Sequence, residues 1–246
     1  VKNPTLSPDG IKVAFTDKDN NLCVWNSLDG KVAKLTSDGT NVIMNGYASW
    51  VYYEEILGRP SRYRAFWWSP DSRTIAFYKF DDSEISMFPI YDSRGKHGFI
   101  TETRYPKAGD KNPEVKIAFV NVEDGSTVWA DFDHTLDQYF GIPFWNADGS
   151  RFIIPWMPRE QNNLVLYTVN PADGSKEPIY NENQKTWIDW MEDMQFVEDG
   201  FFMVRDFEMW EQIYFQSFDG KRLEKITDGK NWGIRFVKVD MKEGSI

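Results

Sequence analysis

Two adjacent glutamates, Glu54 and Glu55, are the residues whose types and spacing most clearly suggest chemistry. They follow an aromatic run over residues 47–53 that includes Trp50. Neighbouring carboxylates repel each other, and burying either one is costly unless a cation or several hydrogen-bond donors meet it. An ammonium group has three donors and no acceptor, so it is a natural ligand for such a pair. The alternative is a solvated acidic corner that binds nothing.

The backbone around the pair must take a particular form for both carboxylates to reach one ligand. Successive side chains of a regular strand point to opposite faces, so we expect a short helix or an irregular turn here. Three arginines follow, and they could pair with the glutamates or be solvated: Arg59, Arg62 and Arg64. Exposed ion pairs contribute little to stability, which favours solvation.

A repeat of turns and short strands surrounds this segment. Related turns, three of them Asp-Gly and one Asp-Ser, end at residues 10, 72, 149 and 200, each before a run of alternating apolar residues. A second Asp-Gly turn follows in the units at residues 30, 125, 174 and 220. Such turns between alternating runs are a strong hairpin signal. A period of about 50 residues indicates a propeller rather than a β-sandwich, which shows no long-range copying.

We therefore predict an all-β fold in which residues 1–246 form a single, partial β-propeller domain. It should have four to five blades of four-stranded antiparallel sheet, at about 7–39, 67–132, 140–184 and 193–229, with another blade beginning at 231. Two segments break the period: 40–66, a short helical or irregular insertion that carries the glutamates, and 81–113. Insertions on a repeat scaffold usually form loops on one face, where binding often occurs.

Composition narrows the class of protein. The net charge is −10 and there is no basic stripe, which argues against nucleic-acid binding. The sequence has no run of about 18 apolar residues, so we expect no membrane span. Cys23 is the single cysteine, which excludes an intrachain disulfide and indicates a small buried hydrophobe. No metal-ligand spacing occurs, so we expect no metal and no cofactor.

The chain also lacks a nucleophile motif. It contains no Gly-x-Ser-x-Gly sequence, so we assign no catalytic residue, and we interpret His134 as a solvated turn histidine rather than a triad member. The sequence opens in mid-pattern at Val1, without a signal-peptide pattern. We interpret it as a piece of a longer precursor.

Three motifs in series resemble the dipeptidyl peptidase IV family of serine peptidases. Residues 49–55 (Ser-Trp-Val-Tyr-Tyr-Glu-Glu) are similar to its Asp-Trp-Val-Tyr-Glu-Glu-Glu motif, with Ser49 and Tyr53 as departures. Residues 65–71 resemble its Trp-Trp-Ser-Pro blade start. Residues 105–109 and 112–115 match its Tyr-Pro-Lys-Ala-Gly and Asn-Pro-x-Val signature. The similarity is good from Ser7 to about Val120 and is generic propeller pattern after Phe132.

The resemblance implies an architecture and a role for the glutamates. Members of the family have an N-terminal eight-bladed propeller followed by an α/β-hydrolase domain, and two propeller glutamates bind the free N-terminal amine of a peptide. Cleavage then falls after the second residue, usually Pro or Ala. By this resemblance Glu54 and Glu55 bind substrate, the partners are a peptide with a free N-terminus and the hydrolase domain of the same polypeptide, and this piece alone is inactive.

Further expectations also rest on the resemblance. An arm at about 81–105 would form a homodimer contact through apolar residues, or those residues fold back on their own blade: Ile85, Met87, Phe88, Ile90, Phe99 and Ile100. One cysteine and no glycosylation sequon look like a bacterial member, periplasmic or exported. Two other functions stay open, a non-enzymatic propeller interaction module and the propeller of a prolyl tripeptidyl peptidase.

Overall fold

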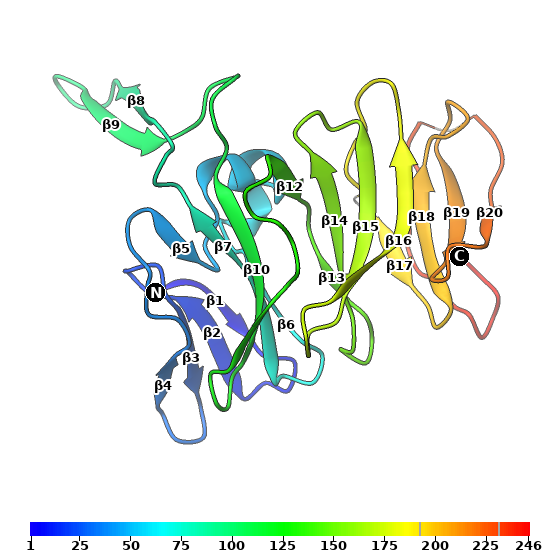
Figure 1. Ribbon diagram of the computed structural model, residues 1–246, viewed down its shortest axis with the longest axis horizontal. Helices are drawn as coiled ribbons and strands as arrows, with labels where there is room; N and C mark the ends of the chain where they lie inside the picture. The colour runs from blue at the N-terminus through cyan, green and yellow to red at the C-terminus, as the bar shows by residue number, and fades with distance from the viewer. Residues whose placement is uncertain (192, 231) are drawn as a thin grey trace.

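Antiparallel strands make up most of the protein. The structure is a computed structural model that describes residues 1–191, 193–230 and 232–246. Its strands form four sheets that follow one another along the chain, and a separate two-stranded arm (Figure 1). The four sheets are open, since none of the described strands closes a sheet on itself. The all-β prediction is confirmed.

The first and fourth sheets are simple four-stranded meanders. The first contains β1 (Lys2–Leu6), β2 (Lys12–Thr16), β3 (Leu22–Asn26) and β4 (Val32–Lys34). The fourth contains β17 (Met194–Phe196), β18 (Gly200–Arg205), β19 (Gln212–Ser217) and β20 (Leu223–Lys225). The predicted Asp-Gly turns connect strands of the first sheet, and Gly10 and Gly30 have φ values of 74° and 70°. Glycine adopts these positive angles without a steric penalty.

The second and third sheets each have an interrupted edge. In the second, β5 (Ile43–Asn45) and β6 (Phe66–Trp68) both pair with β7 (Thr74–Asp81), followed by β10 (Glu114–Asn121) and β11 (Thr127–Trp129). In the third, β12 (Gln138–Phe140) and β13 (Phe144–Trp145) both pair with β14 (Phe152–Pro158), followed by β15 (Asn163–Val169) and β16 (Lys176–Asn183). Residues 46–65 leave the second sheet through its gap and carry η1 (Tyr52–Ile56) and η2 (Arg59–Ser61).

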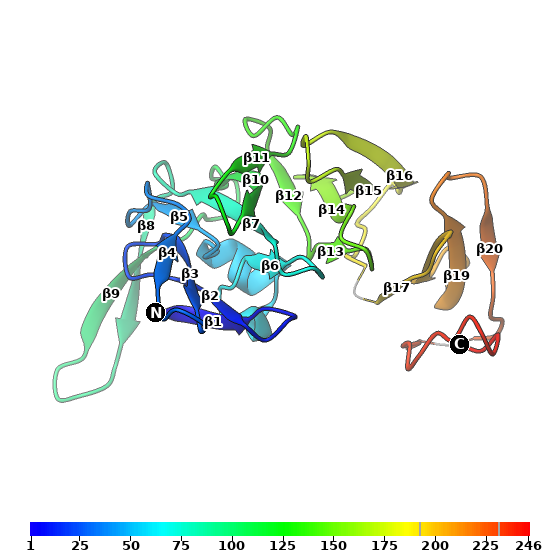
Figure 2. The same ribbon diagram turned by 90° about the horizontal axis from the view of Figure 1, so that it is seen from below.

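The second interruption of the repeat is a hairpin arm, as expected. β8 (Met87–Asp92) and β9 (Phe99–Arg104) pair only with each other and project away from the four sheets (Figures 1 and 2). The arm leaves the second sheet after β7 and returns to it at β10.

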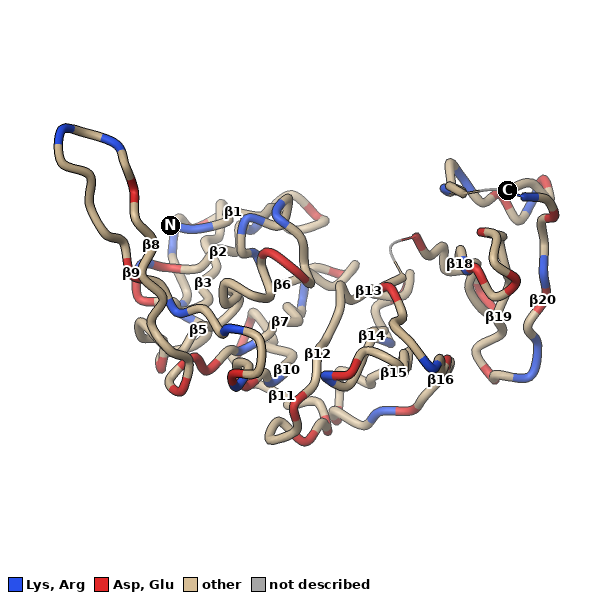
Figure 3. The backbone as a smooth tube through the Cα atoms, turned by 90° about the horizontal axis from the view of Figure 1, so that it is seen from above, with Lys and Arg blue, Asp and Glu red and all other residues tan. Residues whose placement is uncertain are grey.

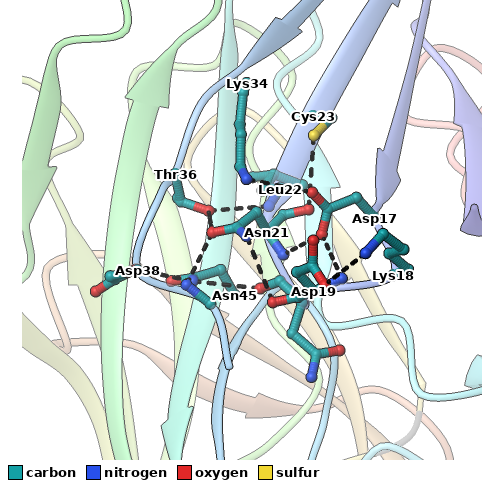
Figure 4. Close-up of polar contacts among 12 residues, drawn as sticks. Asp17, Lys18, Asp19, Asn21, Leu22, Cys23, Lys34, Thr36, Asp38 and Asn45 are labelled. Atoms are coloured by element: carbon teal, nitrogen blue, oxygen red, sulfur yellow. Dashed lines mark hydrogen bonds and ion pairs between the residues drawn. The ribbon is translucent and has the colours of Figure 1, made fainter. Parts of the chain in front are cut away.

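Polar contacts fasten the first sheet to the second (Figure 4). The Asn45 side chain donates a 3.0 Å hydrogen bond to Asp38, and its backbone N–H donates to the Asn20 carbonyl at 3.0 Å. Cys23 lies beside this network, 3% exposed, and burial raises the pKa of its thiol to about 11. The prediction of a small buried residue at this position is confirmed.

A large aromatic core lies between the second and third sheets. It joins β7, β10, β12 and β14 to η1, and its fully buried members include Tyr52, Tyr78, Phe80, Phe140 and Phe152. Figure 1 shows the light-blue coil of the insertion between β7 and β12. The core therefore fixes the glutamate-bearing insertion to two sheets at once.

The observed sheets begin earlier in the chain than the predicted blades. The first sheet includes β1, which precedes the expected range of 7–39, and the second includes β5, well before residue 67. Within residues 232–246 the structure shows an isolated bridge between Asp240 and Ser245. The blade limits, and a further blade from 231 onward, stay predictions, and residue 231 itself lies outside the described residues. In the described part of the chain no helix is long and apolar enough to cross a membrane.

Candidate functional site

The insertion turns into a helix where the glutamates stand. η1 is a short π-helix in which the Leu57 N–H donates to the Tyr52 carbonyl at 2.7 Å. A helical backbone rotates adjacent side chains by about 80–100° instead of the 180° of a strand. Glu54 and Glu55 are thereby freed from pointing to opposite faces, and the prediction of a short helical insertion is confirmed.

Tyr52 anchors this helix in the aromatic core. Its side chain is fully buried, and its ring packs edge-on against Phe80 with centroids 4.9 Å apart. Its hydroxyl accepts a 3.2 Å hydrogen bond from the Phe140 N–H in β12. Burial raises the pKa of Tyr52, so the hydroxyl stays neutral. The helix that carries the glutamates is thus tied to the third sheet as well as to the second.

A stack of tyrosines braces the base of the insertion. The Tyr63 ring lies between those of Tyr47 and Tyr53, with centroid distances of 4.9 Å and 3.8 Å. Tyr47 also forms a β-bridge with Arg64, which closes the loop. Tyr53 stands where the family motif has its first glutamate, and the stack gives this departure a structural reason.

Glu54 is already held on both carboxylate oxygens. Trp50 Nε1 donates to Oε2 at 2.6 Å, and the Arg59 guanidinium pairs with Oε1. Of the two alternatives for the loop arginines, Arg59 takes the pairing one although its side chain is largely exposed, because Gly58 takes a φ of 75° and the chain turns back through η2. In the described part of the chain Arg62 and Arg64 form no ion pair.

Glu55 has a different environment. It is exposed and, with Val51 and Ile56, lines a cavity of about 770 Å³. The remaining lining comes from the third and fourth sheets, their connections and residues 232–235, which follow the fourth sheet. It includes Tyr139, Trp187, Trp190, Asp189, Asp193, Arg205, Asp206, Glu211 and Arg235. The lining carries more carboxylates than guanidinium groups, so it favours a cation. Glu54 does not line this cavity, so the two glutamates, although adjacent in the chain, have different surroundings.

A buried ion pair supports the wall of this cavity. Arg205 donates to both oxygens of Glu182, at 2.9 and 2.8 Å, and so joins β18 to β16. Burial opposes ionisation of Glu182, but the bonds from Arg205 outweigh it and lower the pKa of the carboxyl. The Arg205 charge is therefore neutralised within the protein. No sequence motif pointed to this pair, whose members are 23 residues apart on different sheets.

The root of the arm touches the same site. Tyr105 packs edge-on against Trp50 with ring centroids 6.2 Å apart, and so supports the indole that donates to Glu54. Beyond the root, Ile85 is buried, whereas Met87, Ile90, Phe99 and Ile100 are exposed. Of these residues, Ile85, which is nearest the blade, packs against the protein, whereas the four farther out along the arm are exposed to solvent.

His134 lies apart from the residues that line the cavity. His134 Nδ1 lies 3.1 Å from the Glu114 carboxylate in a partly exposed position. Among the described residues no three His, Cys, Asp or Glu side chains cluster as a metal site would require.

Comparison with known proteins decides the family. The family model described as "Dipeptidyl peptidase IV (DPP IV) N-terminal region" matches residues 1–246. The chain belongs to the dipeptidyl peptidase IV family. The four sheets correspond to blades of the N-terminal propeller of this family. The predicted recognition and fold class are confirmed.

Individual members of the dipeptidyl peptidase IV family show how much of their length this chain spans. It is 30% identical over 198 residues, 74% of the chain, to the "Probable dipeptidyl-aminopeptidase B" of Phaeosphaeria nodorum. It is 27% identical, over 96% of the chain, to the dipeptidyl peptidase 4 of Trichophyton rubrum. The crystal structure of Porphyromonas gingivalis dipeptidyl peptidase 4 superposes with a TM-score of 0.81 at 28% identity, covering 92% of this chain. The chain spans 21%, 32% and 32% of these proteins respectively.

Proposed function

We propose that this chain is the substrate-recognition propeller of a serine exopeptidase that removes N-terminal dipeptides after Pro or Ala. Glu54 and Glu55 anchor the free amine of the peptide. The observation that carries the proposal is the position of Glu55, which is exposed and lines an acidic, aromatic cavity, while Trp50 holds Glu54, the preceding residue of the same helix. The names of the relatives, dipeptidyl peptidases, agree with this reaction.

The chemistry of an ammonium group fits this arrangement. It can donate separately to two carboxylates, and such charge-assisted bonds are stronger than neutral ones. A partly enclosed cavity lowers the effective dielectric and strengthens them further. Fixing the peptide at its N-terminus also sets which carbonyl reaches the nucleophile, which is a gain in orientation. A peptide with a blocked N-terminus would leave both carboxylates without their partner. This cost disfavours its binding, so the site selects peptides with a free amine.

The bond-breaking groups lie elsewhere in this proposal. The hydrolase domain of the same polypeptide supplies the nucleophile, and residues 1–246 alone are inactive. Whether two or three residues are released then depends on the distance from Glu55 to that nucleophile. We also propose that the arm contacts a second subunit and that the protein is a bacterial one, periplasmic or exported. Cell fractionation tests the compartment.

The direct test substitutes each glutamate in the full-length protein. Glu54→Gln and Glu55→Gln should each lower kcat/KM for a Gly-Pro chromogenic substrate by at least about tenfold, because a lost charged hydrogen bond is typically worth about 1.5–3 kcal/mol. The control is Glu177→Gln, an exposed carboxylate on β16, which should leave the kinetics unchanged. Wild-type kcat/KM in both glutamate variants would refute the assignment.

A further inference from the structure

The two groups that hold Glu54 differ in how firmly they are themselves held. Trp50 is partly buried and packs against Tyr105, so its indole N–H is fixed. The Arg59 side chain is 69% exposed, whereas that of Glu54 is 20% exposed. Ion pairs with one freely solvated partner contribute little, because water and salt compete for the long side chain. Arg59 is therefore the partner that Glu54 can lose at little cost.

The peptide amine needs the oxygen that Arg59 occupies. Trp50 engages Oε2 of Glu54, and Arg59 engages Oε1. Both an ammonium and a guanidinium are cations that only donate hydrogen bonds. A carboxylate oxygen has two lone pairs, so Oε1 has room for a second donor, but two cations at one oxygen repel each other. An amine that binds Glu55 and extends to Glu54 therefore competes with Arg59 for this carboxylate.

We infer that Arg59 is an internal competitor of the substrate: its guanidinium occupies Glu54 in the free protein and leaves when the peptide amine binds. This inference rests on the proposed amine-anchoring function. Trp50 has the opposite role, because it keeps the carboxylate in place after Arg59 has moved into solvent. Arg59 directly follows Gly58, whose φ of 75° turns the chain back toward Glu54.

Substitution of Arg59 tests whether its side chain competes with the substrate amine or merely holds Glu54 in place. In the full-length protein Arg59→Ala should lower KM for the Gly-Pro substrate, and Ki for the product dipeptide Gly-Pro, by about two- to fivefold, the range of an exposed ion pair. The value of kcat should change by less than about twofold. The gain should shrink in high salt, because salt already screens the pair in the parent protein. Arg59→Lys should return KM toward the parent value.

Two matched variants complete the test. Arg62→Ala removes an arginine of the same loop that has no carboxylate partner in the described part of the chain, and should leave KM unchanged. Trp50→Phe should raise KM. An Arg59→Ala variant with unchanged or raised KM overturns the competition, since mere support of Glu54 cannot tighten binding. If Glu55→Gln is also without effect, the amine-anchoring function itself fails; if Glu55→Gln lowers kcat/KM, only this inference fails.

Discussion

Asp82 shows how one buried carboxyl can make stability depend on pH. It is 5% exposed at the root of the arm, and its Oδ1 has no hydrogen-bond partner among the described residues. Burial raises the pKa of this carboxyl to about 7; the Arg104 charge partly offsets the effect and Asp81 adds to it. An unfolded chain would return the pKa to about 3.8. The folded protein therefore binds more protons than the unfolded chain between about pH 4 and 7, and the free energy of unfolding falls as the pH rises through that window.

Asp82→Asn should remove this penalty. At about pH 8 the variant should be more stable by about 1–4 kcal/mol, the upper value being the full linkage for the shift. Below about pH 4 the advantage should disappear, because Asp82 is then neutral as well. Urea unfolding followed by tryptophan fluorescence at both pH values measures this, with Glu198→Gln, an exposed carboxylate that does not act on Asp82, as the control. A variant that is less stable than the parent at about pH 8 would contradict the account.

Single residues also show the limits of sequence reasoning at the site. Glu54 and Glu55 were identified from their residue types and the motif around them. The sequence left pairing of Arg59 open but favoured solvation, because the pairing depends on the positive φ of Gly58 and on the short turn that follows. Arg205 and Glu182 meet only because the third and fourth sheets are neighbours, which no local pattern encodes.

The strands themselves were predictable, but their division among sheets was not. Asp-Gly turns and alternating residues marked most hairpins. The sequence placed residues 40–66 between two blades, whereas β5 and β6 both pair with β7, opposite residues 79–81 and 75–77. Register of this kind is set by tertiary pairing and by the hydrophobic pattern of the partner strand. The insertion therefore begins and ends at two short strands that pair with the same strand, β7.

The arm is the element whose surface suggests a partner. Tyr91 and Ile100 face each other across β8 and β9 and are 67% and 66% exposed. A two-stranded hairpin has little stability alone, and exposed apolar side chains on it suit an interface. Tyr91→Asp with Ile100→Asp should convert a dimer of the full-length protein to a monomer in light scattering. Thr101→Asp, on the opposite face of β9, should not. Equal masses for the parent and the double variant would contradict the proposed contact.

At the scale of the whole molecule the cavity belongs to several sheets. Its lining comes from η1 of the second sheet, from β12 of the third and from β18 of the fourth, so no single blade makes the site. The sheets follow one another across Figure 2, with the arm on the side away from the C-terminus. Acidic and basic residues are interspersed over them (Figure 3), while the net charge of the chain is −10. The excess of carboxylates in the cavity therefore agrees with the negative net charge of the whole chain, and both favour a cationic ligand.

Selectivity for a free amine tests the central claim most directly. The ratio of kcat/KM for Gly-Pro p-nitroanilide to that for its N-acetyl derivative measures the preference for a free amine, and its change between parent and variant measures what the two glutamates contribute. The full-length parent should prefer the free amine by at least about 100-fold, and the Glu54→Gln/Glu55→Gln variant by less than about tenfold, because its amides no longer demand a cation. A double variant that keeps the parental ratio would show that the two glutamates do not read the peptide N-terminus.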